Sequence, residues 1–227
     1  MIKKNIIKNI NYTKNKIKSL DFDAHWYRRV FHTFGAALVL YYMLPDIDWI
    51  NTLKIYAPPI LVVFALSLEI LRLNGHLSSN HFFGLRMYEQ KRLGSYVFFA
   101  VGILILLMFF PQQIAIPCIL CACLGDPIIG ELRNRSNKRY ANSIGFIICM
   151  FFFMIVWHKS NIYLLFLISI IGGFGAIIGE TKKFWWLDDD FMIQILPAIL
   201  IGIIWILMPY IGLSYPDIII HPFRWPW

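Results

Sequence analysis

The chain has 227 residues, of which 59% are hydrophobic and 17% aromatic, while only 15% are charged. Soluble domains usually carry about 25% charged residues, so this composition excludes an ordinary soluble protein and points to lipid as the solvent. The net charge of +8 does not indicate a nucleic-acid partner, because the basic residues are distributed by membrane side.

The chain begins with a basic segment, residues 1–24, in which Ile is interspersed with Lys and Asn. Such a segment either lies on anionic headgroups as an amphipathic helix or forms a disordered basic tail, and the sequence leaves both open. No linker divides the remainder, so residues 25–227 are predicted to form one transmembrane domain, which also carries the candidate catalytic residues.

Apolar blocks long enough, or nearly long enough, to cross a bilayer follow one another along this domain. They are continuously apolar rather than alternating, which favours helices over a barrel. The prediction is an all-α, polytopic transmembrane helix bundle of about seven spans. The blocks are approximately 31–44, 57–73, 95–111, 113–125, 143–157, 161–179 and 191–213.

The basic residues indicate the orientation of these spans. Residues 1–29 hold eight Lys and Arg, and the second, fourth and sixth loops hold four, four and two. The other loops and the C-terminal tail hold only three of the 21. By the positive-inside rule the N-terminus is cytoplasmic, and seven spans place the C-terminus outside. Ten of the 13 acidic residues also fall on the predicted cytoplasmic side, although the rule does not require it.

Two candidate groups come from the first two spans. Arg28 and His32 are four residues apart, so they share a helix face where Arg can bind phosphate and His can transfer a proton. Glu69 and Arg72 lie near the cytoplasmic end of the second span. A lone carboxylate there is costly, so we expect Glu69 to point into the bundle and pair with Arg72 or another basic residue.

Two further groups are rich in carboxylates. Gly125-Asp126-Pro127 is predicted to end the fourth span, and bases follow it at Arg133, Arg135, Lys138 and Arg139. Asp188, Asp189 and Asp190 stand in a row before the last span, preceded by Lys182 and Lys183. Carboxylates bind Mg²⁺ and bases bind phosphates, so Asp126, Asp188 and Asp189 are the metal candidates, with Mg²⁺ or another divalent cation as cofactor. The bases are the candidates for a triphosphate.

Four short stretches in this order resemble the CTP-dependent membrane lipid kinases (dolichol, phytol and yeast-type diacylglycerol kinases), which are related to phosphatidate cytidylyltransferase. The stretches are RRVFHTFG, EILRLNG with the following NHFFGLRMYEQKRLG, GDPIIGELRNR and LDDDFMIQILP. The sequence departs from the family pattern at Pro127, at Gly130-Glu131, in KRYANSIGF, and at Asp190, where the family has Asn.

The resemblance implies a multi-pass membrane enzyme that transfers the γ-phosphate of CTP to the hydroxyl of a lipid alcohol at the cytoplasmic face. Asp126 is then catalytic, together with Glu69 or His32, which orients or deprotonates the lipid hydroxyl. Arg28 and Arg72 join the bases as nucleotide-binding candidates. Cytidylyl transfer to phosphatidate is the first alternative and a small transporter the second. The acceptor lipid and self-association stay open.

Overall fold

The computed structural model describes residues 28–77, 85, 87–182 and 187–223, and every regular element in these residues is a helix. Residues 28–35 are α-helical and continue as the 3₁₀ helix η1. The prediction of an all-α chain is therefore confirmed for the described residues. The elements are η1 (Ala36–Met43), α2 (Asp48–Leu73), η3 (Met87–Lys91), α3 (Ser95–Phe109), α4 (Gln112–Leu120), η4 (Cys121–Gly125), α5 (Asp126–Arg135), α6 (Lys138–Trp157), α7 (Ile162–Thr181), α8 (Asp189–Leu207) and η5 (Met208–Ile211).

Five helices are long and apolar enough to cross a membrane, which confirms the coarser prediction of a membrane-type helix bundle. The continuous run α4–η4–α5 counts as one of them, and α8 with η5 as another. The remaining predicted spans, 31–44 and 95–111, are also helical but shorter, in residues 28–43 and in α3. The five are Asp48–Leu73, Gln112–Arg135, Lys138–Trp157, Ile162–Thr181 and Asp189–Ile211.

Short polar side chains fix where three of these helices begin. The side chain of Asn137 accepts a hydrogen bond from the Arg139 amide at 3.1 Å and starts α6. Asn161 does the same for the Tyr163 amide at 3.0 Å and starts α7. Asp188 accepts from the Asp190 amide at 3.4 Å and starts α8. Asn and Asp are favoured at this position because they satisfy amides that have no partner within the helix.

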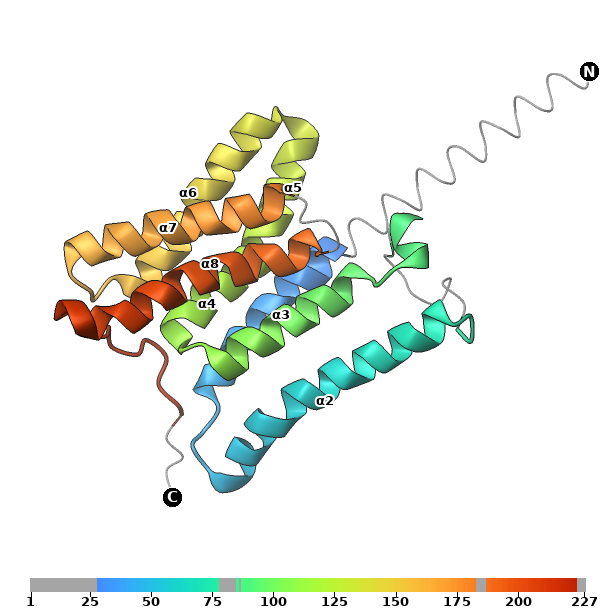
Figure 1. Cartoon of the computed structure of the whole chain (residues 1–227), viewed down its shortest axis with the longest axis horizontal. Coiled ribbons are helices and arrows are strands. Elements are labelled where there is room, and N and C mark those ends of the chain that lie inside the picture. The colour runs from blue at the N-terminus through green and yellow to red at the C-terminus, as the bar shows by residue number, and fades with distance from the viewer. Residues whose placement is uncertain (1–27, 78–84, 86, 183–186, 224–227) are drawn as a thin grey trace, which may run out of the picture.

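The core lies between α3, α4, α6, α7 and α8, while α2 lies at the edge of the bundle (Figure 1). Helices α7 and α8 approach closely at Gly179, where a Cβ would lie 2.3 Å from the Met192 carbonyl oxygen. The four cysteines are free and buried, as expected for small apolar packing residues. Only 11% of the apolar window of α2 is buried within the protein, against 67% for Gln112–Arg135, so α2 presents most of its surface to its surroundings.

The predicted end of the fourth span at Gly125-Asp126-Pro127 is wrong. The chain passes through one π-helical turn, η4, and continues as α5 to Arg135. Pro127 follows directly on the π-helical turn, and such a turn accommodates the hydrogen bond that a proline removes from a helix. Asp126 and Arg133 are therefore side chains of one helix rather than of a loop.

Segments far apart in sequence meet at the two ends of the bundle. At one end lie the start of the first helix, α5, the end of α7 and the start of α8, which carry most of the charged candidates. At the other end the C-terminal segment crosses the bundle: the Phe223 amide donates to the Met43 carbonyl at 2.9 Å, and the Gln112 side chain donates to the Ile220 carbonyl at 3.1 Å. The polar residues thus gather at one end of the helices.

Candidate functional site

A cavity of about 160 Å³ opens at the charged end of the bundle. Its walls come from four segments: the first helix, α5, the end of α7 and the start of α8. Most of its polar lining is ionisable, with bases and carboxylates facing one another. The lining residues are Arg28, Arg29, His32, Asp126, Pro127, Gly130, Arg133, Asn134, Glu180 and Asp189.

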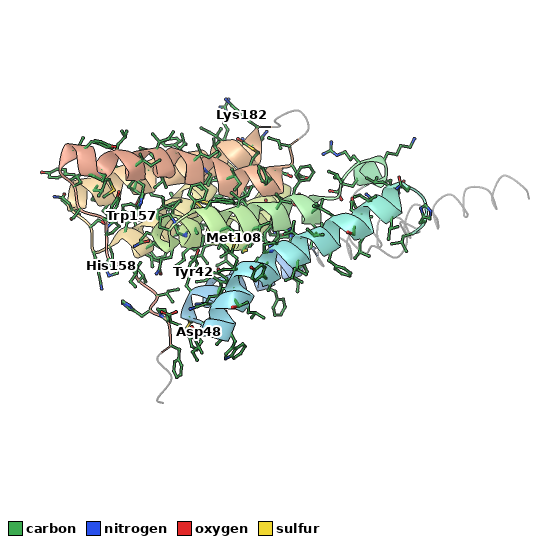
Figure 2. The ribbon with its side chains drawn as sticks, turned by 60° about the horizontal axis from the view of Figure 1, so that its bottom comes forward. Tyr42, Asp48, Met108, Trp157, His158 and Lys182 are labelled. Atoms are coloured by element: carbon green, nitrogen blue, oxygen red, sulfur yellow. The ribbon has the colours of Figure 1, made fainter. Side chains whose placement is uncertain are left out.

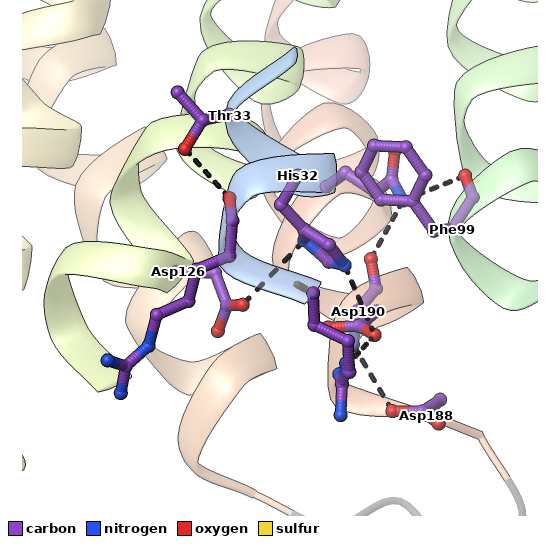
Figure 3. A network of polar contacts seen from close by, with 9 residues as sticks. His32, Thr33, Phe99, Asp126, Asp188 and Asp190 are labelled. Atoms are coloured by element: carbon purple, nitrogen blue, oxygen red, sulfur yellow. Dashed lines mark hydrogen bonds and ion pairs between the residues drawn. The ribbon is translucent and has the colours of Figure 1, made fainter. Parts of the chain in front are cut away.

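His32 stands at the centre of this site, between two carboxylates (Figure 3). Its Nδ1 lies 3.8 Å from Asp126 Oδ2, and its Nε2 lies 3.8 Å from Asp190 Oδ2. Both distances exceed the usual hydrogen-bond range but lie within ion-pair range, so a protonated imidazole would pair with both carboxylates. The ring packs on Phe99, with 4.8 Å between centroids, and the side chain is only 5% exposed. His32 is thereby held in place by an apolar contact on one side.

Asp190 is the most buried carboxylate of the site, with 1% exposure. Arg28 Nη2 donates to its Oδ2 at 3.0 Å. The other oxygen, Oδ1, is buried and has no hydrogen-bond partner among the described residues. Gln194, one turn later on α8, donates to the Asp190 carbonyl at 2.7 Å and to the Phe99 carbonyl at 3.3 Å, which ties this end of α8 to α3. A buried carboxylate oxygen without a partner is costly unless something binds it.

Arginines balance the remaining carboxylates around the cavity. Arg133 Nη2 donates to Glu180 Oε2 at 2.7 Å, which joins α5 to the end of α7. Arg29 pairs with Glu131 on the outer rim, and Glu131 also pairs with the exposed Arg135. These pairs hold the cavity walls together, and Arg28, Arg29 and Arg133 remain in its lining.

The donor set fits a divalent cation. Ligand atoms of His32, Asp126 and Asp190 all lie within 4.8 Å of one another, and so do those of Asp188, Asp189 and Asp190. Two carboxylates with phosphate oxygens are the usual ligands of Mg²⁺, and an added imidazole is also accepted by Mn²⁺ and Zn²⁺. The unpartnered Asp190 Oδ1 is an independent indication, because a cation would satisfy it. The geometry therefore has the capacity for a metal, with Asp190 at its centre.

The structure brings together several of the residues that the sequence singled out. Arg28, His32, Asp126, Arg133 and Asp189 all line the cavity, and Asp188 lies beside Asp189 and Asp190. Sequence reasoning left out Asp190, which corresponds to Asn in the family pattern. The signal that would have found it is the spacing Asp190–Gln194 on one helix face, which marks both side chains as inward-facing.

Other candidates lie away from the cavity lining. Arg135 is exposed on the outer side of α5, and Lys138, Arg139 and Lys182 are exposed as well. Lys183 lies outside the described residues. Glu69 and Arg72 belong to a different cluster, between α2 and α3.

The predicted pairing of Glu69 with Arg72 is confirmed. Arg72 donates to both carboxylate oxygens, at 2.6 and 2.8 Å, and both side chains are fully buried. The Tyr96 hydroxyl donates to Glu69 Oε2 at 2.6 Å, and the Gly94 amide donates to Oε1. Arg72 also donates to backbone carbonyls of the segment before α3, including that of Arg92 at 2.7 Å. Glu69 is thus saturated with hydrogen bonds and fastens α2 to the start of α3.

In comparisons with known proteins, no family model, curated protein or solved structure matches the chain.

Proposed function

We propose that this protein is a divalent-cation-dependent phosphotransferase that moves the γ-phosphate of CTP to the hydroxyl of a membrane lipid at the His32 cavity. The observation that carries the proposal is the cluster of Asp126, Asp189 and Asp190 facing arginines at one end of an apolar helix bundle. Phosphoryl transfer is catalysed mainly by positioning and by charge neutralisation, and this cluster has the groups for both. The resemblance to CTP-dependent lipid kinases supports the choice of nucleotide and acceptor.

Each side chain has a part in this reaction. The lipid hydroxyl oxygen attacks the γ-phosphorus, the bond from that phosphorus to the bridging oxygen of CDP breaks, and the hydroxyl proton passes to His32. The imidazole suits this role because the carboxylates of Asp126 and Asp190 flank it and would stabilise the imidazolium that forms when it takes the proton. Arg28 and Arg133 offer guanidinium donors to the phosphate oxygens. A divalent cation bound by Asp126 and Asp190 would neutralise the charge of the triphosphate.

Glu69 has no place in the chemical step of this proposal. Its two oxygens already accept four hydrogen bonds, so it has little capacity left to take a proton or orient a hydroxyl. His32 is the better proton acceptor of the two candidates, and Glu69 serves to hold the start of α3.

We also propose seven spans, with a cytoplasmic N-terminus and an external C-terminus, so that residues 28–43 and α3 join the five long helices. The distribution of Lys and Arg supports this orientation. The gathering of the predicted cytoplasmic segments at one end of the bundle agrees with it.

Accessibility labelling tests this topology, and the four buried native cysteines leave little background. A membrane-impermeant thiol reagent applied to intact cells should label Lys159→Cys, between α6 and α7, and a cysteine at position 227. It should not label Ser136→Cys, between α5 and α6, or a cysteine at position 2. Labelling of Ser136→Cys and Lys159→Cys from the same side would overturn the orientation and the span count.

Cytidylyl transfer to phosphatidate is the alternative chemistry, because the same cluster would serve an attack on the α-phosphate. A transporter is disfavoured, since transporters bind their substrates near the membrane midplane and this cavity lies at the end of the bundle.

The deciding experiment supplies the purified protein, in lipid nanodiscs with Mg²⁺, with CTP labelled at either the α- or the γ-phosphate. The acceptors are a panel of polyprenols, phytol, diacylglycerol and phosphatidate. We expect the γ-label, and not the α-label, to enter a lipid alcohol with release of CDP. Entry of the α-label with release of pyrophosphate would assign cytidylyl transfer instead. Entry of neither label, from CTP or from other nucleoside triphosphates, would reject both.

A further inference from the structure

A groove of about 470 Å³ runs between η1, α2 and α3, on the side of the molecule away from α6 and α7. Its walls are almost entirely aliphatic and aromatic. Among the described residues that line it, Lys54 alone is charged, and its ammonium donates to the Leu44 carbonyl at 2.8 Å, near the far end of the groove. Figure 2 shows why the groove exists: α2 diverges from α3 toward Asp48, and the two helices come together at the opposite end.

One end of the groove adjoins the His32 cavity. Phe99 lines the groove and at the same time packs on the His32 ring, with 4.8 Å between centroids. Phe31, the residue before His32, also lines the groove. The polar cavity and the apolar groove therefore adjoin across the Phe99 ring, and a molecule with its polar end at His32 would have to pass beside this ring to reach the groove.

The dimensions of the groove match one leaflet of a membrane. Its lining runs from Tyr96 to Leu107 on α3 and from Leu53 to Ala65 on α2. At 1.5 Å per residue, the two stretches span about 16 and about 18 Å, roughly half of a hydrocarbon core about 30 Å thick. Its edges carry exposed Phe31, Leu53 and Leu61, so the groove is open along its side to surrounding lipid.

We propose that this groove holds one hydrocarbon chain of the lipid whose hydroxyl is placed beside His32. The proposal rests on the proposed function, which identifies the polar end of the lipid as a hydroxyl. It adds the position of the hydrocarbon chain of that lipid. A chain can enter sideways from the leaflet, and its length beyond the groove can remain in the membrane. The acceptor class is accordingly a long-chain lipid alcohol, selected by apolar contact along α2 and α3 rather than by polar recognition of its tail.

The glutamate network gives the groove its shape. Tyr96 lines the groove and donates to Glu69, while Arg72 holds the segment that leads into α3. The polar junction at one end fixes α2 against α3, and the divergence of the helices beyond it leaves room for a chain.

Photocrosslinking tests the proposal without requiring turnover. The probe is a long-chain alcohol carrying a diazirine in mid-chain, added to the full-length protein in lipid nanodiscs. We expect the crosslinks to concentrate on peptides of α2 and α3, and an excess of unlabelled long-chain alcohol to compete. Ala65→Trp and Ala100→Trp, both in the groove lining, should each lower crosslinking at least about fivefold. Ala37→Trp, on an exposed position of η1 outside that lining, should leave it unchanged.

Three results would overturn the proposal: crosslinks of the probe spread evenly over all lipid-facing helices, an equal loss of crosslinking in Ala37→Trp, or crosslinks of the probe to α2 and α3 that persist in excess unlabelled alcohol. Circular dichroism and size-exclusion chromatography confirm that the tryptophan variants are folded. If crosslinking behaves as expected while no label from CTP reaches any lipid, the groove stands and the proposed phosphotransfer fails. If label from CTP reaches a lipid but the groove variants crosslink normally, the proposed phosphotransfer stands and the groove proposal fails.

Discussion

Two clusters of buried charge lie in the described part of the molecule, and they are built in opposite ways. In the Glu69–Arg72 cluster, both carboxylate oxygens accept two hydrogen bonds each, and the guanidinium binds backbone carbonyls as well. In the His32 cluster, the imidazole stands 3.8 Å from Asp126 and from Asp190, and Asp190 Oδ1 has no partner among the described residues. The first cluster is saturated, and the second is left with capacity for a ligand.

The difference teaches how to separate structural from functional charges in a membrane protein. Ionisable residues within spans are costly, and they are functional candidates by default. In a saturated pair, internal hydrogen bonds already offset the desolvation free energy of the buried charges, so the pair requires no external ligand. In a cluster of carboxylates with an unsatisfied oxygen, the desolvation free energy is offset only when a cation or substrate binds. Removal of a side chain should therefore affect stability in the first cluster and activity in the second.

The largest expected effect is on activity at the unsaturated cluster. Asp126→Asn and Asp190→Asn should each lower phosphotransfer from CTP at least about a thousandfold. A metal ion contributes several kcal/mol of transition-state stabilisation, and each 1.4 kcal/mol is tenfold in rate. Yield and thermal unfolding should change little, because neither carboxylate is saturated by internal bonds. Asp217→Asn, an exposed carboxylate at the other end of the chain, is the control and should retain full activity.

The saturated cluster should respond in stability instead. Glu69→Gln leaves Arg72 buried with an impaired partner and should cost about 3 kcal/mol in the free energy of unfolding, the lower end for a broken buried pair. Turnover of the folded protein at low temperature should stay within a few-fold of normal. Adding Arg72→Met to Glu69→Gln should cost much less than the sum of the two single changes. A hundredfold loss of turnover in folded Glu69→Gln would instead assign Glu69 to the chemistry.

A change at the α7–α8 contact tests whether the acidic start of α8 depends on close packing. At Gly179 an added Cβ would meet the Met192 backbone, which cannot move aside cheaply. We expect Gly179→Ala to destabilise the protein by about 1–3 kcal/mol, as overpacking does. Gly130→Ala is the matched control in thermal unfolding, since a Cβ there meets nothing within 4 Å and alanine favours the helix. Equal unfolding temperatures for the two variants would contradict the close contact.

The smallest expected effect is a change in the KM for CTP, which distinguishes two arginines of α5. Arg133→Gln removes a donor from the cavity and should raise the KM for CTP about tenfold, because charge-assisted bonds to phosphate contribute roughly 1.5–3 kcal/mol. Arg135→Gln removes an exposed guanidinium whose partner among the described residues is the rim residue Glu131, and it should leave the KM unchanged. The same KM in both variants would mean that the cavity does not bind the triphosphate.

Much of this fold follows from the sequence. Continuous apolar blocks predicted helices, and the described residues contain all seven as helical segments, five of them long enough to span. Depth and polarity predicted that Glu69 pairs with Arg72 or another basic residue, because a carboxylate inside a span requires a partner nearby, and the structure selects Arg72. The residue types and positions of His32, Asp126 and Asp189 predict them as site candidates, and the structure places all three in the cavity lining.

The errors have physical reasons. Gly125-Asp126-Pro127 looks like a helix end, yet a π-helical turn carries the helix through it, and single-residue propensities do not register such a turn. Asp190 was passed over because three adjacent aspartates look equivalent in sequence. Only the start of α8 at Asp189 decides that Asp190 turns inward to Arg28 and Gln194. The groove between α2 and α3 depends on a divergence angle that no local pattern specifies.

The central claim is that the His32 cluster binds a divalent cation, and Mn²⁺ binding tests it most directly. Electron paramagnetic resonance on the purified protein in nanodiscs measures bound Mn²⁺, with and without CTP. We predict saturable binding near one ion per chain that tightens when CTP is present and weakens at least about tenfold in Asp190→Asn, but not in Asp217→Asn. Equal Mn²⁺ binding by Asp190→Asn and the unmodified protein would contradict the account.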